Sequence, residues 1–170
     1  MEKNIVLIGM MGCGKTTVGG LLAQRFGCPL ADTDELIEGR EGRSIPDIFA
    51  QDGETGFRAL ELALCRELSG QSGLVIACGG GLPLQDGAIG ALKGNGVVFW
   101  LDADPGETFD LLDVSGRPLA QAGREDFIRR YHDRAPVYRR WADFIIRDYH
   151  QNYDGAGEQI STIYQEVSEP

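Results

Sequence analysis

The segment from residue 9 to residue 16 combines residue types that can bind phosphate. It reads GMMGCGKT and matches the pattern G-x-x-x-x-G-K-[ST] of a phosphate-binding loop, or P-loop. The glycines let backbone N–H groups cradle phosphate oxygens, while Lys15 can reach the β- and γ-phosphates and the Thr16 hydroxyl can ligate Mg²⁺. An apolar stretch, residues 4–8, precedes the loop, and helical spacing follows it. The segment therefore predicts a nucleotide site.

Two carboxylates follow the next predicted strand, which covers residues 29–31. Asp32 and Asp34 alternate along an extended segment, so one can hold Mg²⁺ through water while the other orients or deprotonates an acceptor hydroxyl. The alternative is that both side chains only cap the helix that follows. Next to a P-loop, the pair favours the functional interpretation.

Two further segments could bind an anionic acceptor. Residues 79–81 are three consecutive glycines after the strand predicted at 74–77, which suits a backbone that lies close to a ligand and offers N–H donors. Arg58 could clamp a carboxylate with two hydrogen bonds, and Glu61, three residues later, could hold it in place. A simple surface ion pair between these two side chains is the alternative.

Alternating strands and helices must position these candidate residues. Apolar, β-branched stretches predict strands at 4–8, 29–31, 74–77, 96–101 and 144–146. Helical spacing predicts helices over 15–26, from 34 to about 39, from 44–46 onward, and over 53–69, 84–93, a segment after 124, and 155–167. Five parallel strands covered by helices on both faces make a three-layer α/β sandwich, in which ligands bind beyond the carboxyl ends of the strands.

The composition narrows the classes of function. The 170 residues fit one domain over 1–170, and the net charge of −10 argues against a nucleic-acid partner. Eight of the 16 basic residues lie between Arg117 and Arg147, which suggests a local site for anionic ligands, although most of these arginines are expected on a solvated helix face.

The four cysteines lack the spacing of a zinc site or redox pair, and no apolar stretch is long enough to cross a membrane. We expect a soluble, cytoplasmic monomer.

The order and spacing of the motifs resemble those of the shikimate kinases, small relatives of the nucleoside monophosphate kinases. The resemblance covers nearly the whole chain, and the series of motifs is far more specific than the P-loop alone. It comprises residues 9–17, Asp32-Thr33-Asp34, residues 44–49, Gly53-Glu54, Phe57-Arg58, Glu61, Gly79-Gly80-Gly81, Arg117-Pro118-Leu119 and Arg134-Ala135-Pro136-Val137-Tyr138.

The resemblance implies that ATP gives its γ-phosphoryl group to the 3-hydroxyl of shikimate. The products would be shikimate 3-phosphate and ADP, in the chorismate pathway to the aromatic amino acids, with Mg²⁺ as cofactor. The implied nucleotide-binding residues are Gly12, Cys13, Gly14, Lys15, Thr16, Thr17 and Arg117, and the implied metal-binding residues are Thr16 and Asp32. The implied shikimate-binding residues are Asp34, Arg58, Gly79, Gly80, Gly81 and Arg134.

The resemblance also assigns roles to single side chains. Lys15, Asp34 and Arg117 would be catalytic: the two cations would neutralise charge on the transferring phosphoryl group, and Asp34 would meet the acceptor hydroxyls. Arg58 and Arg134 would hold the shikimate carboxylate.

Two regions would complete the site. Residues 33–61 would form an acceptor-binding helical region, in which Ile45, Phe49 and Phe57 make an apolar wall against the ring of the substrate. The polar stretch at about 112–124 would be a mobile lid that brings Arg117 to the phosphates and excludes water when it closes.

The nucleoside end departs from the family pattern. Members commonly carry a basic residue about seven positions before the lid arginine, where it stacks on adenine, but Asp110 stands here and Asp113 follows. An anion cannot make that cation–π contact. Residues 147–154 also lack the usual basic and proline residues. We therefore expect nucleotide binding that is weaker, or less selective for the base, than in a typical member.

Two other functions fit parts of the sequence. A gluconate-kinase-like sugar-acid kinase would share the P-loop and an anionic polyol substrate, but the Phe57-Arg58, triple-glycine and Arg-x-Pro-x-Tyr motifs argue against it. A nucleotide-binding regulatory homologue with impaired catalysis is the second alternative. The presence of all the implied catalytic and acceptor-binding side chains weighs against that loss.

Overall fold

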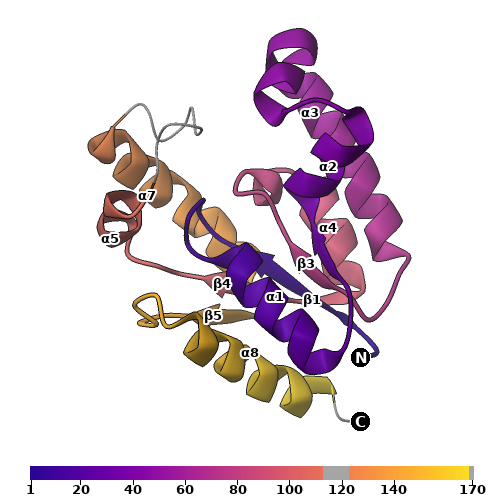
Figure 1. Cartoon of the computed structure of the whole chain (residues 1–170), viewed down its shortest axis with the longest axis vertical. Helices are drawn as coiled ribbons and strands as arrows, with labels where there is room; N and C mark the ends of the chain where they lie inside the picture. The colour runs from indigo at the N-terminus through magenta and orange to yellow at the C-terminus, as the bar shows by residue number, and fades with distance from the viewer. Residues whose placement is uncertain (113–122, 169–170) are drawn as a thin grey trace.

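The computed structural model describes residues 1–112 and 123–168 (Figure 1). The predicted lid therefore lies almost wholly outside the described residues, and so does Arg117. In chain order, the first half contains β1 (Asn4–Ile8), α1 (Lys15–Phe26), β2 (Leu30–Asp32), α2 (Thr33–Glu41), α3 (Ile45–Ser69) and β3 (Val75–Ala77). The second half contains the 3₁₀ turn η1 (Leu82–Leu84), α4 (Asp86–Gly94), β4 (Gly96–Leu101), α5 (Pro105–Asp110), α7 (Arg124–Trp141), β5 (Phe144–Ile146) and α8 (Tyr153–Ser168).

The five strands form one parallel sheet in the order β2-β3-β1-β4-β5. Strand β1 lies at the centre, where Ile5 pairs with Val75 on one side and with Val97 on the other. Every residue of β1 is buried, as expected for a strand covered on both faces, and this explains the continuous apolar sequence from Ile5 to Ile8. The predicted parallel α/β sheet is confirmed.

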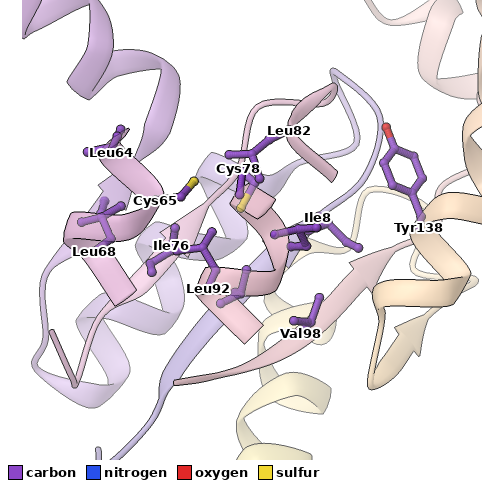
Figure 2. Packing of buried hydrophobic residues seen from close by; sticks show 14 of the residues in the cluster. Ile8, Leu64, Cys65, Leu68, Ile76, Cys78, Leu82, Leu92, Val98 and Tyr138 are labelled. Atoms are coloured by element: carbon purple, nitrogen blue, oxygen red, sulfur yellow. The ribbon is translucent and has the colours of Figure 1, made fainter. Parts of the chain in front are cut away.

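Side chains of the sheet alternate between two apolar layers. Ile8, Ile76 and Val98 face the layer that contains α3, α4 and α7, where Figure 2 shows them near Leu64, Leu68, Leu92 and Tyr138. Residues one position away along the strands, such as Leu7, Val75 and Phe99, face the layer formed with α1 and α8. Figure 1 shows α1 and α8 side by side on that face. The sheet is thus the middle of a three-layer sandwich, as predicted.

Helix boundaries follow local capping chemistry. Ser44 caps α3 by accepting a hydrogen bond from the Asp47 N–H at 3.3 Å, and Pro46 stands in the first turn, where its missing N–H costs nothing. The two helices expected around residue 53 form one element with a kink at Gly53, whose φ of 72° and ψ of 179° are not helical. Only glycine adopts that conformation easily.

One helix was absent from the sequence prediction. Helix α5 follows Asp104, whose carboxylate accepts a hydrogen bond from the Glu107 N–H at 2.9 Å, and Pro105 occupies its first turn. The Asp-Pro start is a recognisable helix signal, but α5 is too short to show apolar periodicity. Within the described residues, no helix has the length and apolarity needed to cross a membrane.

Candidate active site

The P-loop joins the carboxyl end of β1 to α1 and depends on its glycines. Gly9, Gly12 and Gly14 have φ angles of 147°, 78° and 100°, which side chains rarely adopt. A Cβ on Gly12 would collide with Leu112, and one on Gly14 would collide with the ring of Tyr153. The loop therefore takes a compact shape that ends at the N-terminus of α1, where free N–H groups and the helix dipole favour a phosphate.

Lys15 organises the same loop. Its ammonium donates hydrogen bonds to the carbonyl oxygens of Gly9 and Met10, both at 2.8 Å, and lies 3.7 Å from Cys13 Sγ. Cys13 itself is buried, with 2% of its surface exposed. The arrangement keeps a cation inside the curve of the loop, where it can neutralise phosphate charge.

The two predicted metal ligands touch each other. Thr16 Oγ1 donates to Asp32 Oδ2 at 2.6 Å, which brings together the end of β2 and the start of α1. Asp32 Oδ1 accepts hydrogen bonds from the N–H groups of Asp34 and Glu35, at 3.0 and 3.2 Å, and so caps α2. The capping alternative is correct for Asp32. Its second oxygen, however, faces the P-loop threonine, so the cap also supports a metal site.

Asp34 does not cap the helix, and its carboxylate lies beside Gly79 in the turn after β3. Burial, together with the charge of Asp32, raises the pKa of Asp34, while Lys15 and Arg58 oppose that rise. A carboxyl group whose pKa is raised is a better proton acceptor once it is ionised. The structure thus places a carboxylate between the cation of the P-loop and the predicted acceptor clamp.

The three glycines after β3 bring the predicted acceptor-binding side chains together. A Cβ on Gly79 would lie 2.6 Å from Asp34 Oδ1, one on Gly80 would lie 3.4 Å from Arg134 Nη1, and one on Gly81 would overlap the Arg58 guanidinium. A Cβ on Gly80 would also lie 3.5 Å from the backbone nitrogen of Met11, which belongs to the P-loop. Residues far apart in the sequence therefore converge on one turn, next to the phosphate site.

Two side chains form hydrogen bonds with the backbone of the triple glycine, and the sequence analysis quoted both within motifs without assigning them a role. The Gly79 N–H donates to Thr33 Oγ1 at 2.9 Å, and Thr33 is fully buried. Of the three glycines expected to offer N–H donors to a ligand, Gly79 therefore uses its N–H within the protein. The buried Tyr138 hydroxyl donates to the Gly80 carbonyl at 2.7 Å.

Tyr138 belongs to the same sequence motif as Arg134, but the sequence does not show which group accepts a hydrogen bond from its hydroxyl. Burial raises the pKa of Tyr138 to about 12, so the hydroxyl keeps its proton at neutral pH and can donate. Its ring packs 5.7 Å from that of Trp100, measured between centroids. Tyr138 thereby connects α7, which carries the buried Arg134, to the turn after β3.

Arg58 is fixed by a buried carboxylate. Its guanidinium pairs with Glu61 one turn later on α3, and only 1% of the Glu61 surface is exposed. Glu61 Oε2 also accepts a hydrogen bond from Gln85 Nε2 at 2.8 Å. Burial raises the pKa of Glu61, and Arg58 opposes that rise. The surface-pair alternative is therefore wrong, because this ion pair is part of the interior of the site.

An apolar wall stands beside the clamp. The rings of Phe49 and Phe57 pack with centroids 4.8 Å apart, and the Arg58 guanidinium carbon lies 5.5 Å from the centroid of Phe57. Phe57 is buried, whereas 38% of Phe49 is exposed. Ile45 packs against the buried apolar cluster that includes Phe57.

The region predicted to bind the nucleoside contains an exposed ion pair and a loop with unusual backbone angles. Asp110 forms an ion pair with Arg124, with Oδ1 and Nε 3.0 Å apart, so a cation from α7 lies beside the anion that departs from the family pattern. The loop after β5 is strained, since Asp148, His150 and Gln151 all have positive φ. Its neighbour Tyr149 is buried and donates to the Cys13 carbonyl at 2.6 Å.

That loop lines a small pocket beside the P-loop. Gly12 and Cys13 form one side, and the loop after β5 and the segment around α5 form the others. Neither the Arg124 pairing nor the Tyr149 hydrogen bond could be anticipated from sequence, because each joins residues from separate elements.

Comparisons with known proteins agree with this geometry. The family model described as shikimate kinase matches residues 11–167. A shikimate kinase from Thiobacillus denitrificans is 41% identical over 157 residues, which cover 91% of this chain and 86% of the relative. One from Clostridium beijerinckii is 35% identical over 169 residues, covering 99% and 95% of the two chains.

A solved structure is similar over the same span. Shikimate kinase from Acinetobacter baumannii in complex with shikimate superposes with a TM-score of 0.90 at 34% identity, covering 99% of this chain and 96% of that one. A sugar kinase from Janibacter reaches a TM-score of 0.65 at 15% identity, which shows a shared fold alone. The family model and the curated relatives span nearly the whole chain, and this chain belongs to the shikimate kinase family.

Proposed function

We propose that this protein transfers the γ-phosphoryl group of ATP to the 3-hydroxyl of shikimate and releases shikimate 3-phosphate and ADP. The observation that carries the proposal is the convergence of Asp34, Arg58 and Arg134 on the three glycines beside the P-loop. One carboxylate and two guanidinium groups in one cleft suit an acceptor that has both hydroxyls and a carboxylate. The product belongs to the route to chorismate and the aromatic amino acids.

The acceptor is bound by charge and by shape. Arg58 and Arg134 hold the shikimate carboxylate through charge-assisted hydrogen bonds, and Gly80 and Gly81 leave room for the ring. Phe49 and Phe57 cover the apolar side of that ring. Binding in this orientation presents a ring hydroxyl to Asp34, on the side of the cleft nearest to the P-loop.

Asp34 orients the hydroxyl and accepts its proton as the oxygen attacks the γ-phosphorus. Its raised pKa suits it to that task, and the charge of Lys15 opposes the rise and favours the ionised form. The P-loop N–H groups and Lys15 stabilise the phosphate charge during transfer. We assign a second cation for the same charge to Arg117, by resemblance, together with a lid over residues 112–124 that excludes water.

Mg²⁺ fits the donors at the base of the P-loop. The Thr16 hydroxyl and the Asp32 carboxylate are hard oxygen ligands, and they lie within hydrogen-bond distance of each other. A bound Mg²⁺ would supply positive charge to the β- and γ-phosphate oxygens. Removing Mg²⁺ with a chelator should therefore abolish turnover while leaving the fold intact.

The site favours this reaction over the two alternatives. A gluconate-like acceptor has no rigid ring to fill the space beside Phe49 and Phe57. The presence of Lys15 and Asp34, the implied catalytic residues that the structure describes, supports an active kinase over an impaired homologue. We further propose that the protein acts as a cytoplasmic monomer. Among the described residues, the exposed large apolar side chains come from separate parts of the chain: Met1, Phe49, Leu84, Leu111 and Val167.

Product analysis tests the proposed reaction. Incubation with ATP, Mg²⁺ and shikimate should give a phosphate monoester whose ³¹P resonance couples to the proton at C3 of the ring. Coupling to a different ring proton would place the phosphate on another hydroxyl and contradict the assignment. Light scattering after gel filtration tests the monomer.

A further inference from the structure

Gln85 stands at the N-cap position of α4 but does not cap it. A side chain there usually accepts a hydrogen bond from the first turn of the helix, as Ser, Thr, Asp or Asn does. The Gln85 side chain makes no such bond. Its amide nitrogen instead donates to Glu61 Oε2 on α3, at 2.8 Å. The Gln85 side chain therefore bonds to a buried carboxylate and not to its own helix, which indicates a role at that carboxylate.

Glu61 receives two donors on the same oxygen. Oε2 accepts from Arg58 on its own helix and from Gln85 across the gap to α4. Two donors from different elements constrain the position of Oε2 more than Arg58 alone would. The Arg58 guanidinium that pairs with it lies against Gly81, in the acceptor cleft.

We infer that Gln85 is a positioning residue of the acceptor site, whose amide holds Arg58, through Glu61, in the orientation that binds the acceptor carboxylate. The inference rests on the proposed function, because it assigns Arg58 to shikimate. It concerns a side chain that contacts Glu61 and not the substrate, so its effect should appear in acceptor binding before it appears in turnover.

The charges around Glu61 give the expected pH dependence. The groups that face it are Arg58 and Cys65 on α3, Asp34 on α2, Gln85 before α4 and Cys78 after β3. Burial and Asp34 raise the pKa of Glu61, while Arg58 and the Gln85 hydrogen bond lower it. Acceptor binding should be lost as pH falls through the pKa of Glu61, and removal of the Gln85 amide should move that loss to higher pH.

The test replaces Gln85 by methionine, which has similar length and no donor. In Gln85→Met the KM for shikimate should rise about five- to tenfold, with the KM for ATP unchanged and kcat little altered. The acid limb of kcat/KM for shikimate should shift to higher pH. Gln85→Lys restores a donor at that position and should return the KM to near its original value.

Glu54 offers a matched control. It also approaches Arg58, at 3.7 Å, but 71% of its side chain is exposed, so the pair contributes little. Glu54→Gln should leave the KM for shikimate unchanged. A Gln85→Met protein that loses thermal stability but keeps the parental KM and pH profile would show a purely structural role and overturn the inference.

A second readout does not depend on turnover. ¹³C NMR titration of the Glu61 carboxyl in the substrate-free protein should show a higher pKa in Gln85→Met than in the parent. An unchanged Glu61 titration would also refute the inference. Failure of the parent to phosphorylate shikimate would instead refute the proposed function, and the Glu61 titration would still decide whether Gln85 acts on that carboxylate.

Discussion

Asp34 shows how neighbouring charges prepare one side chain for chemistry. Burial and Asp32 raise its pKa, and Lys15 and Arg58 limit that rise. A base works only when ionised, so kcat/KM should fall as pH drops through the pKa of Asp34, and the fall should begin above the ordinary Asp range. The pH–rate profile of the parent protein measures this limb.

The Asp34→Asn substitution removes the base and keeps the shape of the side chain. We predict a kcat lowered by about 10²-fold or more, the usual contribution of general base catalysis. Steady-state kinetics at saturating shikimate and ATP measure the change. Near-normal turnover would show that Asp34 only orients the hydroxyl or lies outside the reaction.

Arg58→Ala should chiefly weaken acceptor binding. Loss of a charge-assisted clamp predicts a KM for shikimate raised about 10- to 100-fold, with the KM for ATP preserved. Arg40→Ala is a suitable control, because Arg40 forms a two-bond ion pair with Glu67 in which both side chains are about half exposed. An unchanged KM for shikimate in Arg58→Ala would exclude the assigned role.

Tyr138→Phe tests the support of the glycine turn. The substitution leaves the Gly80 carbonyl without its donor, which should lower the free energy of unfolding by about 1–2 kcal/mol and raise the KM for shikimate. Tyr164→Phe is the matched control, since the Tyr164 hydroxyl donates to the Lys3 carbonyl far from the site. Equal effects of both variants on KM would contradict the positioning role of Tyr138.

At the level of elements, the site forms because the ends of parallel strands meet. The sequence was sufficient to predict that the segments after β1, β2 and β3 share one crevice, since strand and helix alternate along the chain. It could also identify Lys15, Asp34 and Arg58 by residue type and spacing. The order of the strands in the sheet was not predicted, because it depends on contacts between distant parts of the chain.

The supporting contacts were beyond sequence reasoning for a physical reason. Thr33, Tyr138 and Gln85 act through partners 46, 58 and 24 residues away along the chain. Threonine, tyrosine and glutamine are common in cores and on surfaces, so their residue types do not reveal such partners. The sequence predicted a helix boundary at Gly53, but it did not show the φ and ψ that join the two helices in one kinked element.

Gly53→Ala tests whether the kink in α3 is part of the fold. The space around a Cβ there is open, but the φ of 72° with ψ of 179° would strain alanine. We predict a loss of about 1–3 kcal/mol in the free energy of unfolding. Gly39→Ala, on α2 with open space and no positive φ, should instead stabilise by about 0.5–1 kcal/mol. Urea denaturation compares the two, and stabilisation by both would argue against the kink.

At the scale of the whole molecule, the proposed nucleotide-binding and acceptor-binding halves of the site meet beyond the carboxyl ends of the strands. The two halves differ in how deeply their charged side chains are buried. The acceptor half contains the buried Glu61, which pairs with Arg58, and the buried Arg134. At the nucleoside end, the pair formed by Asp110 and Arg124 is exposed by more than half. Phosphate recognition should therefore contribute more to nucleotide affinity than recognition of the base.

Calorimetric titration with ATP and with GTP tests whether phosphate contacts contribute more to nucleotide affinity than contacts with the base. An anion at residue 110 cannot stack on adenine as a cation does, so we predict weak discrimination between the two nucleotides or weaker ATP binding than is typical of the family. Asp110→Arg should raise the preference for ATP. Tight binding that is strictly selective for ATP in the parent protein would contradict this prediction.

The central claim is that the cleft around Gly79, Gly80 and Gly81 selects shikimate as the phosphate acceptor. The most direct measurement is Mg²⁺- and ATP-dependent ADP release with shikimate, with gluconate, and with no acceptor. The structure predicts rapid ADP release with shikimate and only background release in the other two reactions. Equal release with and without shikimate, or faster release with gluconate, would contradict it.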